Sequence, residues 1–342
     1  QFHSFGYEGR CAAPTPFDAS YCYALGSTAA MLMYKRQCGL MAAVTDLLRA
    51  PEDWVCGGVP ITMLMNMELR HGKDKPVIKK ALVELDGKPF ETFAELREKW
   101  ALNDVYRCVG PTQFARDLDS FNIPYTTRLE FAESESAFPA LPASSGKFET
   151  YLVHGRGKPI LLFEDGPTKN TVMQQRTAHE MELPACLGTV GQGVSAYVGE
   201  PVQNSSARDE TLSKATLPLT SETRELITLS VPELANAVFR AGKPVEGVAA
   251  APGPCKIGVA FCGRQSPGGH NILCGLMKAV EARADGSQLL GFVGGTGGIM
   301  HRSFIQLTSQ YLDKFLNMGG YQALGRTVDR LRGDAALNAV EA

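Results

Sequence analysis

The chain has 342 residues, of which 44% are hydrophobic and 20% charged, as in an ordinary globular protein with room for about two domains. Its formal net charge of −2 gives no basic field for nucleic acid or an anionic membrane, so any phosphate must be bound by a few placed groups. Nine cysteines without CxxC spacing and six histidines without ligand spacing indicate reduced thiols, a cytoplasmic location and no zinc site. No apolar run reaches the roughly 18 residues of a membrane span, and no signal peptide is recognisable.

Residues 1–130 are dense in element signals. Small and apolar residues at helical spacing predict a helix over 20–37, with a start signal at Asp18 and Ser20. The apolar run 39–48 predicts a buried strand. A short helix is expected over 92–101, capped by Thr92 with Glu95 three residues later.

Residues 131–254 have a looser texture, rich in Ser, Pro and charged residues, and predict a partly disordered linker. One helix is expected inside it, over 230–242. Ser230 and Glu233 form its capping box, and Gly242 ends it.

From residue 255 the pattern sharpens again. The run 255–262 predicts a buried strand, residues 270–284 a helix and residues 288–295 a second strand of the same kind. Strand, glycine loop, helix and strand form one βαβ unit of an open α/β sheet. Because the chain ends soon after this unit, we expect it to leave an open sheet edge and an uncovered apolar face.

The stretch "CGRQSPGGHN" (Cys262–Asn271) joins the first of these strands to the helix. A loop in this place presents the unpaired N–H groups of a helix start, and glycines let a phosphate approach the backbone. Glycine-rich turns also serve packing alone, so both interpretations stay open. The loop is neither a Walker A loop nor a GxGxxG dinucleotide fingerprint, which disfavours an unrelated dinucleotide enzyme. A second glycine cluster at Gly294–Gly298 favours a shared pocket.

Three stretches of the rear segment carry a resemblance: "KIGVAFCGRQSPGGHNILCGL", "LLGFVGGTGGIM" and "NMGGYQALGRT". They resemble the opening of the pyrophosphate-dependent phosphofructokinases, over residues 256 to about 332. The front stretches "FGYEGRCAAPTPFDASYCYALG" (5–26) and 68–114 resemble the closing part of the same family, in its plant-type regulatory (alpha) subunit. The chain opens at Gln1 without an initiator methionine, so we expect a piece of a longer chain that straddles two tandem units.

The resemblance implies an α/β, phosphofructokinase-like three-layer Rossmann-type fold, a parallel sheet with helices on both faces. It implies that residues 1–130 are the end of a first unit, on the sugar-phosphate side. Residues 131–254 would be a linker and amino-terminal extension, and residues 255–342 would begin a second unit on the phosphoryl-donor side.

The family's functional residues carry over at nine positions. The fructose 6-phosphate site would use Tyr7, Glu8, Gly9 and Arg10, where a guanidinium can pair two phosphate oxygens at once. Without the family context, Arg10 would be read as a surface ion pair. The phosphoryl-donor loop would comprise Gly263, Arg264, Gly268, Gly269 and His270. His270 is equally compatible with a ring held by local backbone groups.

The resemblance implies a glycolytic phosphotransferase, a kinase that moves phosphate from pyrophosphate or ATP to fructose 6-phosphate, with Mg²⁺ and other phosphofructokinase subunits as partners. Two departures qualify it. Arg264 and Ser266 match the regulatory type, and the catalytic signatures Gly-Gly-Asp-Asp-Ser and Thr-Ile-Asp-Asn-Asp are absent from the chain. We therefore expect no catalytic or metal-binding residue here and an inactive piece on its own. The alternative is a non-catalytic regulatory half that binds a sugar phosphate effector and pairs with a catalytic subunit.

Other residues are read structurally. Cys262 and Cys274 flank the loop and are expected to be buried, inert thiols. Lys73, Lys75, Lys79 and Lys80 form a basic run expected to face solvent. Trp54 and Trp100 are expected in the core or in a subunit contact.

Overall fold

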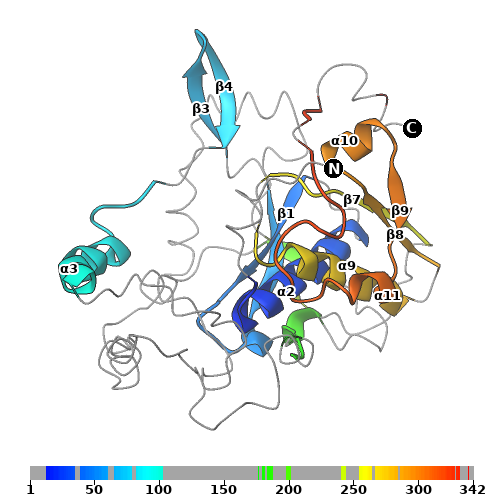
Figure 1. Ribbon diagram of the computed structural model, residues 1–342, viewed down its shortest axis with the longest axis horizontal. Coiled ribbons are helices and arrows are strands. Elements are labelled where there is room, and N and C mark those ends of the chain that lie inside the picture. The colour runs from blue at the N-terminus through cyan, green and yellow to red at the C-terminus, as the bar shows by residue number, and fades with distance from the viewer. Residues whose placement is uncertain are drawn as a thin grey trace, which may run out of the picture. The chain divides into compact units, whose positions relative to one another are not determined.

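The computed structural model describes about half of the chain (Figure 1). The described residues are 13–34, 39–60, 65–78, 82–102, 176, 179–181, 183–187, 198–201, 240–243, 254–263, 266–283, 286–327, 329–331 and 338. The chain divides into two compact units, which are described separately below. The first contains residues 1–14, 18–80 and 181–342, and the second contains 15–17 and 81–180.

Helix α2 (Pro16–Tyr34) begins earlier than the sequence pattern predicted. Proline is well placed in a first helical turn, because the N–H that it lacks would have no intrahelical partner there. Asp18 lies in the first turn, where its charge complements the helix dipole, so it does not mark the boundary. The predicted helix is confirmed and its predicted start is wrong.

One antiparallel sheet of the first unit has the strand order β1-β2-β6-β5. Strands β1 (Leu40–Thr45) and β2 (Val55–Pro60) pair from Leu40 opposite Pro60 to Thr45 opposite Val55, with the 3₁₀ helix η1 (Pro51–Asp53) between them. Strand β6 (Arg240–Lys243) lies between β2 and β5 (Val198–Pro201).

Two expectations for this sheet are wrong. Strand β1 was expected to be buried, yet of its side chains only Val44 is fully buried. Residues 240–242 were expected to end a helix, but they form part of β6 because they pair with β2 and β5. The rest of that helix, 230–239, lies outside the described residues.

Helix α2 packs on this sheet. A Cβ atom at Gly58 of β2 would lie 3.1 Å from the Leu32 side chain, so glycine lets the helix approach closely. Trp54 is buried, donates from its indole N–H to the Arg49 carbonyl (3.1 Å) and meets the Tyr21 ring edge-on. The expectation of Trp54 in the core is confirmed.

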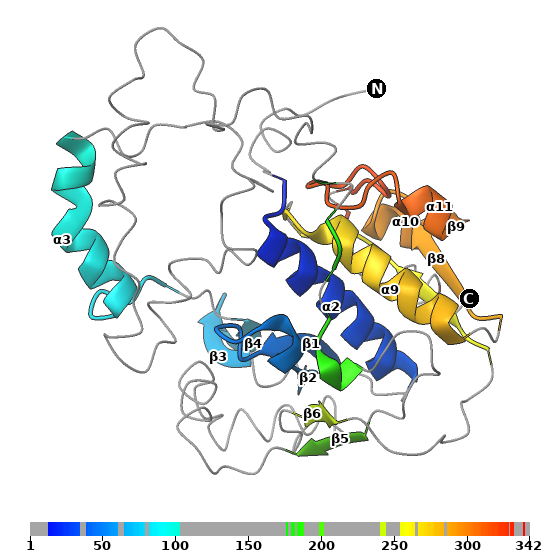
Figure 2. The same cartoon turned by 90° about the horizontal axis from the view of Figure 1, so that it is seen from below.

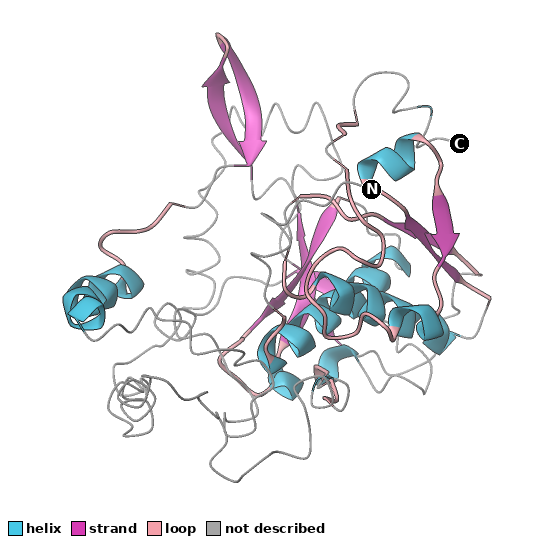
Figure 3. Ribbon diagram, viewed as in Figure 1, coloured by secondary structure: helices cyan, strands magenta, loops and turns pink. Residues whose placement is uncertain are grey.

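The predicted βαβ unit is confirmed, but the expected burial of its two strands is wrong, because only Ile257, Leu289 and Gly291 of them are fully buried. Strand β7 (Lys256–Val259), helix α9 (Gly269–Arg283) and strand β8 (Gln288–Phe292) follow in order, and the strands pair in parallel, with Lys256 opposite Gln288. After the short helix α10 (Thr296–Met300), strand β9 (Phe304–Gln306) adds to β8 in antiparallel direction, and helix α11 (Ser309–Leu312) follows. The strands lie in separate small sheets (Figure 3), so a parallel sheet with helices on both faces stays a prediction.

Helices α2 and α9 run side by side in the same direction (Figure 2) and touch backbone to backbone. A Cβ atom at Gly26 would lie 2.1 Å from the Ile272 carbonyl oxygen, and one at Gly275 would lie 2.1 Å from the Tyr23 carbonyl oxygen. The Ser27 hydroxyl donates to the Gly275 carbonyl (3.2 Å). Helix α2 therefore covers one face of α9, while the expected open edge and uncovered apolar face of the half-sheet stay predictions. The helix pair separates the antiparallel sheet, packed on α2, from β8, which α9 contacts.

The first unit also contains the hairpin of β3 (Met65–Arg70) and β4 (Lys73–Ile78). Its turn residues His71 and Gly72 both have positive φ, as tight hairpin turns require. Lys73 and Lys75 are exposed, which confirms that this part of the basic run faces solvent.

In the second unit, helix α3 (Lys88–Leu102) begins four residues before Thr92. Thr92 therefore lies inside the helix, and its predicted role as the cap is wrong. The rings of Phe93 and Trp100 pack together with centroids 6.3 Å apart. Across the described ranges, no helix combines the length and the apolarity that crossing a membrane requires.

We predict that Gly275→Ala destabilises the fold. The added methyl group meets the Tyr23 carbonyl of α2, and overpacking against backbone costs about 1–3 kcal/mol, more than the roughly 1 kcal/mol that alanine gains in helix propensity. Urea unfolding of the variant measures the loss. Lys278→Ala, at an exposed position of the same helix, is the control and should change stability by less than about 0.5 kcal/mol. An unchanged midpoint for Gly275→Ala would contradict the close helix contact.

Candidate functional site

The first glycine loop (residues 260–268) joins β7 to α9. Its glycines, and Gly269 at the start of α9, lie in different structural environments. Gly263 has φ +86°, a conformation that other residues rarely adopt. A Cβ atom at Gly268 would lie 2.2 Å from the Cys22 sulfur of α2, so this glycine is needed for helix packing. A Cβ atom at Gly269 would have its nearest neighbours at 3.6 Å, which is ordinary contact. Of the three, only Gly269 lacks a packing or backbone reason to be glycine.

The second glycine loop (residues 293–295) lies beside the first. Gly295 also has positive φ, and a Cβ atom there would lie 2.2 Å from the Phe261 carbonyl oxygen. The N–H of Gly294 donates to the Leu324 carbonyl (2.8 Å), which ties this loop to residues further along the chain. The two loops thus meet at the carboxyl ends of β7 and β8, as the sequence predicted.

A third segment, the return loop (residues 313–327), completes the site. The Tyr321 hydroxyl donates to the Gly263 carbonyl (3.2 Å), and the Gly320 N–H donates to the Ser266 carbonyl (3.4 Å). The Arg326 guanidinium lies over the Tyr321 ring, 5.6 Å from its centroid. The return loop therefore brings a phenol and a fixed positive charge to the first glycine loop.

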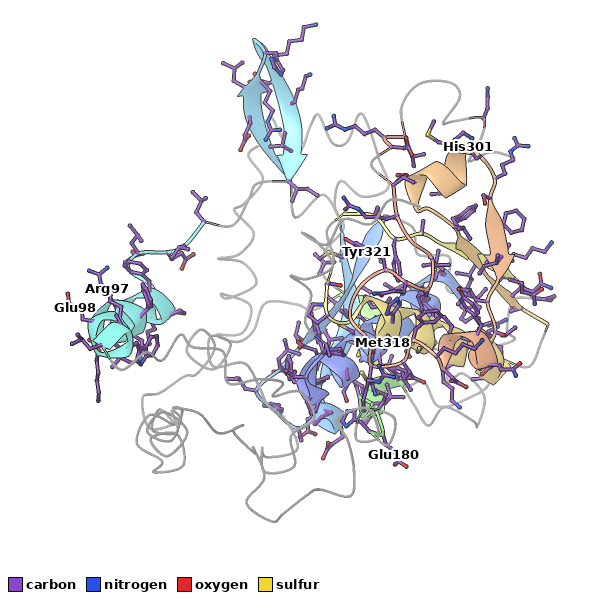
Figure 4. All side chains as sticks on the ribbon, viewed as in Figure 1. Arg97, Glu98, Glu180, His301, Met318 and Tyr321 are labelled. Atoms are coloured by element: carbon purple, nitrogen blue, oxygen red, sulfur yellow. The ribbon has the colours of Figure 1, made fainter. Side chains whose placement is uncertain are left out.

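His270 fastens the return loop to the start of α9. The backbone N–H of Ala323 donates to its Nε2 atom (3.2 Å), so the ring proton lies on Nδ1, which donates to the Met318 carbonyl (2.8 Å; Figure 4 labels Met318). Burial of the ring lowers the pKa of His270 below its ordinary value of 6.5. Both ring nitrogens are engaged with backbone groups about 50 residues away, so in this state the ring orders the loop.

Asn271 makes a second fastening. Its side chain exchanges two hydrogen bonds with Asn317: Nδ2 donates to Oδ1 (2.7 Å), and Oδ1 accepts from the Asn317 N–H (3.1 Å). Both residues are fully buried, and Asn317 has φ +57°, which asparagine tolerates better than most residues. Nδ2 also lies 3.2 Å from the Ala19 carbonyl of α2. Asn271 therefore joins α2, α9 and the return loop.

The start of α10 is already occupied by protein groups. The Gly297 N–H donates to the Thr327 hydroxyl (3.1 Å), and Thr296 donates to the Asp329 carbonyl (2.8 Å). A Cβ atom at Gly297 would lie 2.6 Å from a carboxylate oxygen of Asp329. A negative charge beside this glycine cluster disfavours an anion there, which leaves the start of α9 as the better anion position.

The structure brings together only part of the predicted site. Gly263, Gly268, Gly269 and His270 lie along the first glycine loop and the first turn of α9. The other predicted residues lie outside the described ones, namely Tyr7, Glu8, Gly9, Arg10 and Arg264.

Sequence reasoning missed Tyr321 and Arg326. Both stand in "NMGGYQALGRT", whose glycine pair Gly319–Gly320 and single Gly325 are the signal that could have drawn attention to them.

The thiols near the loop differ from one another. Cys262 lies beyond the end of β7 and is exposed, so its expected burial is wrong. Burial raises the pKa of Cys274 to about 12, which fits the expected inert thiol. Within the described part of the chain, no three His, Cys, Asp or Glu side chains gather as metal ligands would.

Part of the chain is similar to known phosphotransferases. It is 56% identical over 130 residues to pyrophosphate–fructose 6-phosphate 1-phosphotransferase subunit beta 1 of Arabidopsis thaliana, which covers 38% of this chain and 23% of that protein. The enzyme of the same name from Treponema pallidum is 55% identical over 112 residues, 33% of this chain and 20% of its own. These relatives of the chain are pyrophosphate–fructose 6-phosphate phosphotransferases.

The alpha type of subunit matches as well. Subunit alpha 2 of Arabidopsis thaliana is 33% identical over 169 residues, 49% of this chain and 26% of its own length. Both subunit types are therefore homologues, and the expected closeness to the alpha type stays a prediction. The chain spans about a fifth to a quarter of these relatives. No family model matches it.

We predict a pH-dependent stability that His270 sets in part. Because burial lowers the pKa of His270, the unfolded chain binds more protons than the folded one just below pH 6.5, and stability falls as the pH drops through this range. In His270→Gln this loss should become smaller, although half-buried His179, whose pKa burial also lowers, continues to contribute. Thermal unfolding from about pH 5 to 8 measures the difference. His301→Gln, at the exposed end of α10 (Figure 4), is the control, and a wild-type slope in His270→Gln would contradict the assignment.

Proposed function

We propose that the chain is part of a pyrophosphate-dependent phosphofructokinase, a cytoplasmic, glycolytic kinase that transfers phosphate from pyrophosphate or ATP to fructose 6-phosphate to give fructose 1,6-bisphosphate. The 56% identity to a beta subunit over 130 residues carries this proposal. The α/β arrangement of the described residues is compatible with the three-layer Rossmann-type fold of that family.

The phosphoryl-donor loop of the proposed enzyme is the first glycine loop with the start of α9. The N–H groups of a helix's first turn have no intrahelical partner and attract an anion, and Gly269 leaves the backbone open to it. Arg326 supplies a positive charge from the return loop. His270 holds that loop in place, so its contribution to donor binding is to position the site.

The sugar-phosphate side would use Tyr7, Glu8, Gly9 and Arg10. Arg10 pairs the phosphate oxygens in a bidentate manner, and Glu8 accepts from sugar hydroxyls. The packing of α2 on α9 supports a tandem arrangement, because α2 belongs to the front segment that follows these residues and α9 to the rear segment.

A second candidate function is a non-catalytic regulatory half. The absent aspartate signatures and Arg264 favour it, since in-line phosphoryl transfer needs a positioned base and a Mg²⁺ partner. A catalytic phosphofructokinase subunit, or another unit of the same fused chain, would then supply both. In this reading Arg264 fills the donor pocket or holds a phosphate effector.

Calorimetric titration distinguishes the two functions. Wild type, Arg10→Ala and Arg264→Gly are titrated separately with fructose 6-phosphate and pyrophosphate, with Lys278→Ala as the control for a surface charge. Arg10→Ala loses one bidentate phosphate contact. It should therefore bind fructose 6-phosphate more weakly than wild type, by about tenfold or more.

The pyrophosphate titration distinguishes a working donor site from a regulatory half. If wild type binds pyrophosphate and Arg264→Gly weakens it, the loop is a working donor site. If pyrophosphate binds only after Arg264→Gly, the regulatory half is supported. Absence of binding by either ligand to any variant would contradict the proposed function.

A further inference from the structure

Two thiols of the first unit contact each other beside strand β2 of the antiparallel sheet. Cys56 lies on β2 with no exposed surface, and Cys186 lies half-buried on the 3₁₀ helix η5 (Ala185–Leu187). Their side chains are hydrogen-bonded to each other, and Cys56 is also hydrogen-bonded to Thr28 of α2. In its protonated form Cys186 also donates from its S–H to the Trp54 carbonyl (3.4 Å), two residues from Cys56. Two free thiols that are 130 positions apart in the chain are thus in contact.

The pair is chemically asymmetric. Hydrogen bonds from the Cys56 thiol and from backbone N–H groups lower the pKa of Cys186 to about 7, while the same contact and burial raise the pKa of Cys56. About half of the Cys186 side chains are therefore thiolates near neutral pH, and the Cys56 thiol is their hydrogen-bond partner. A low-pKa thiol of partial exposure beside a second thiol is the arrangement of a redox-sensitive cysteine with its resolving partner.

Cys186 belongs to a segment that spans the helix pair. We call the described residues 181 and 183–187 the strap. At one end the Met181 sulfur lies 3.8 Å from the Asn271 amide of α9, and at the other end η5 contacts β2, β6 and η1. Figure 2 shows the strap, in green, crossing α2 between these two ends. A bond at Cys186 would therefore hold the strap across α2, next to the residue that fastens the return loop.

We propose that Cys56 and Cys186 are a redox modification site: a hydroperoxide converts them to a reversible disulfide that fastens the strap to β2. The Cys186 thiolate attacks the peroxide O–O bond and becomes a sulfenic acid, and the leaving oxygen takes up a proton. The Cys56 sulfur then attacks the sulfenic sulfur and loses its proton, and water leaves. In sum, two thiols and one hydrogen peroxide give one disulfide and two waters. This inference holds whether or not the proposed function does.

Other thiols of the same unit provide internal controls. Burial raises the pKa values of Cys22 and Cys274 to about 12, so neither is a thiolate at neutral pH. Cys255 is half-buried and lies near the Ser287 hydroxyl, away from the pair. Selective oxidation of Cys56 with Cys186 would therefore reflect their contact and not general thiol reactivity.

The experiment treats the protein with a small excess of hydrogen peroxide at pH 7.5, blocks remaining thiols and maps peptides without reduction. We expect a Cys56–Cys186 cross-linked peptide, unmodified Cys22 and Cys274, and a midpoint of thermal unfolding higher by about 5 °C, reversed by dithiothreitol. Cys186→Ala and Cys56→Ala should lose the cross-link and the shift, and Cys255→Ala should keep both. Cys186 oxidised to sulfinic acid without a cross-link, or left untouched, would overturn the proposal.

A second readout does not depend on the buried variant folding well. The rate of iodoacetamide alkylation at Cys186 in wild type, followed by peptide mass against pH, should rise with a midpoint near 7. In Cys56→Ala the midpoint should move towards 9.0, the ordinary pKa of a thiol. A wild-type midpoint near 9 would show that Cys186 receives no hydrogen bond from Cys56 and would also overturn the proposal.

Discussion

The close contact of α2 with α9 is the constraint on which the rest of the first unit depends. Gly26 and Gly275 place two helix backbones against each other, although their residues are about 250 positions apart in the chain. Leu32 of α2 lies against Gly58 of β2, and α9 contacts β8, so the glycine contact joins the two halves of the core. It also determines where the first glycine loop lies, because Gly268, the residue just before α9, packs against Cys22. The candidate phosphate position is thus built on a helix that a distant segment holds in place.

Buried polar side chains hold the return loop and α2 against α9, in addition to the apolar packing. His270, Asn271 and Asn317 are fully buried, and their hydrogen bonds go to the return loop and to α2. Buried polar groups are costly unless they are paired, so a network of this kind favours one loop arrangement over its alternatives. Loops that would otherwise be mobile become a fixed surface around the first turn of α9. The same network contacts the strap, because the Asn271 amide lies against the Met181 sulfur. The thiol pair and the candidate site are therefore connected through this contact.

The parts that sequence patterns predicted are those that local physics determines. The βαβ unit could be predicted because short apolar runs, a glycine loop and helical spacing follow each other within about 40 residues. The end of the expected helix 230–242 was wrong because Arg240–Lys243 gains strand partners far away in the chain, which propensity does not register. The α2–α9 contact had no sequence signal, since α2 carries small and apolar residues on all sides. Gly268 was read as a phosphate glycine, yet a helix from the front of the chain already requires it.

Native-state hydrogen exchange followed by mass spectrometry tests the central claim, that α2 and α9 belong to one cooperative core. Peptides from α2 and from α9 are followed at increasing urea concentration, below the unfolding transition. If the glycine contact joins them, their slowest amides converge on the same opening free energy and the same urea dependence. If α2 exchanges through an opening of its own while α9 stays protected, the front segment does not hold the candidate site, and the account is wrong.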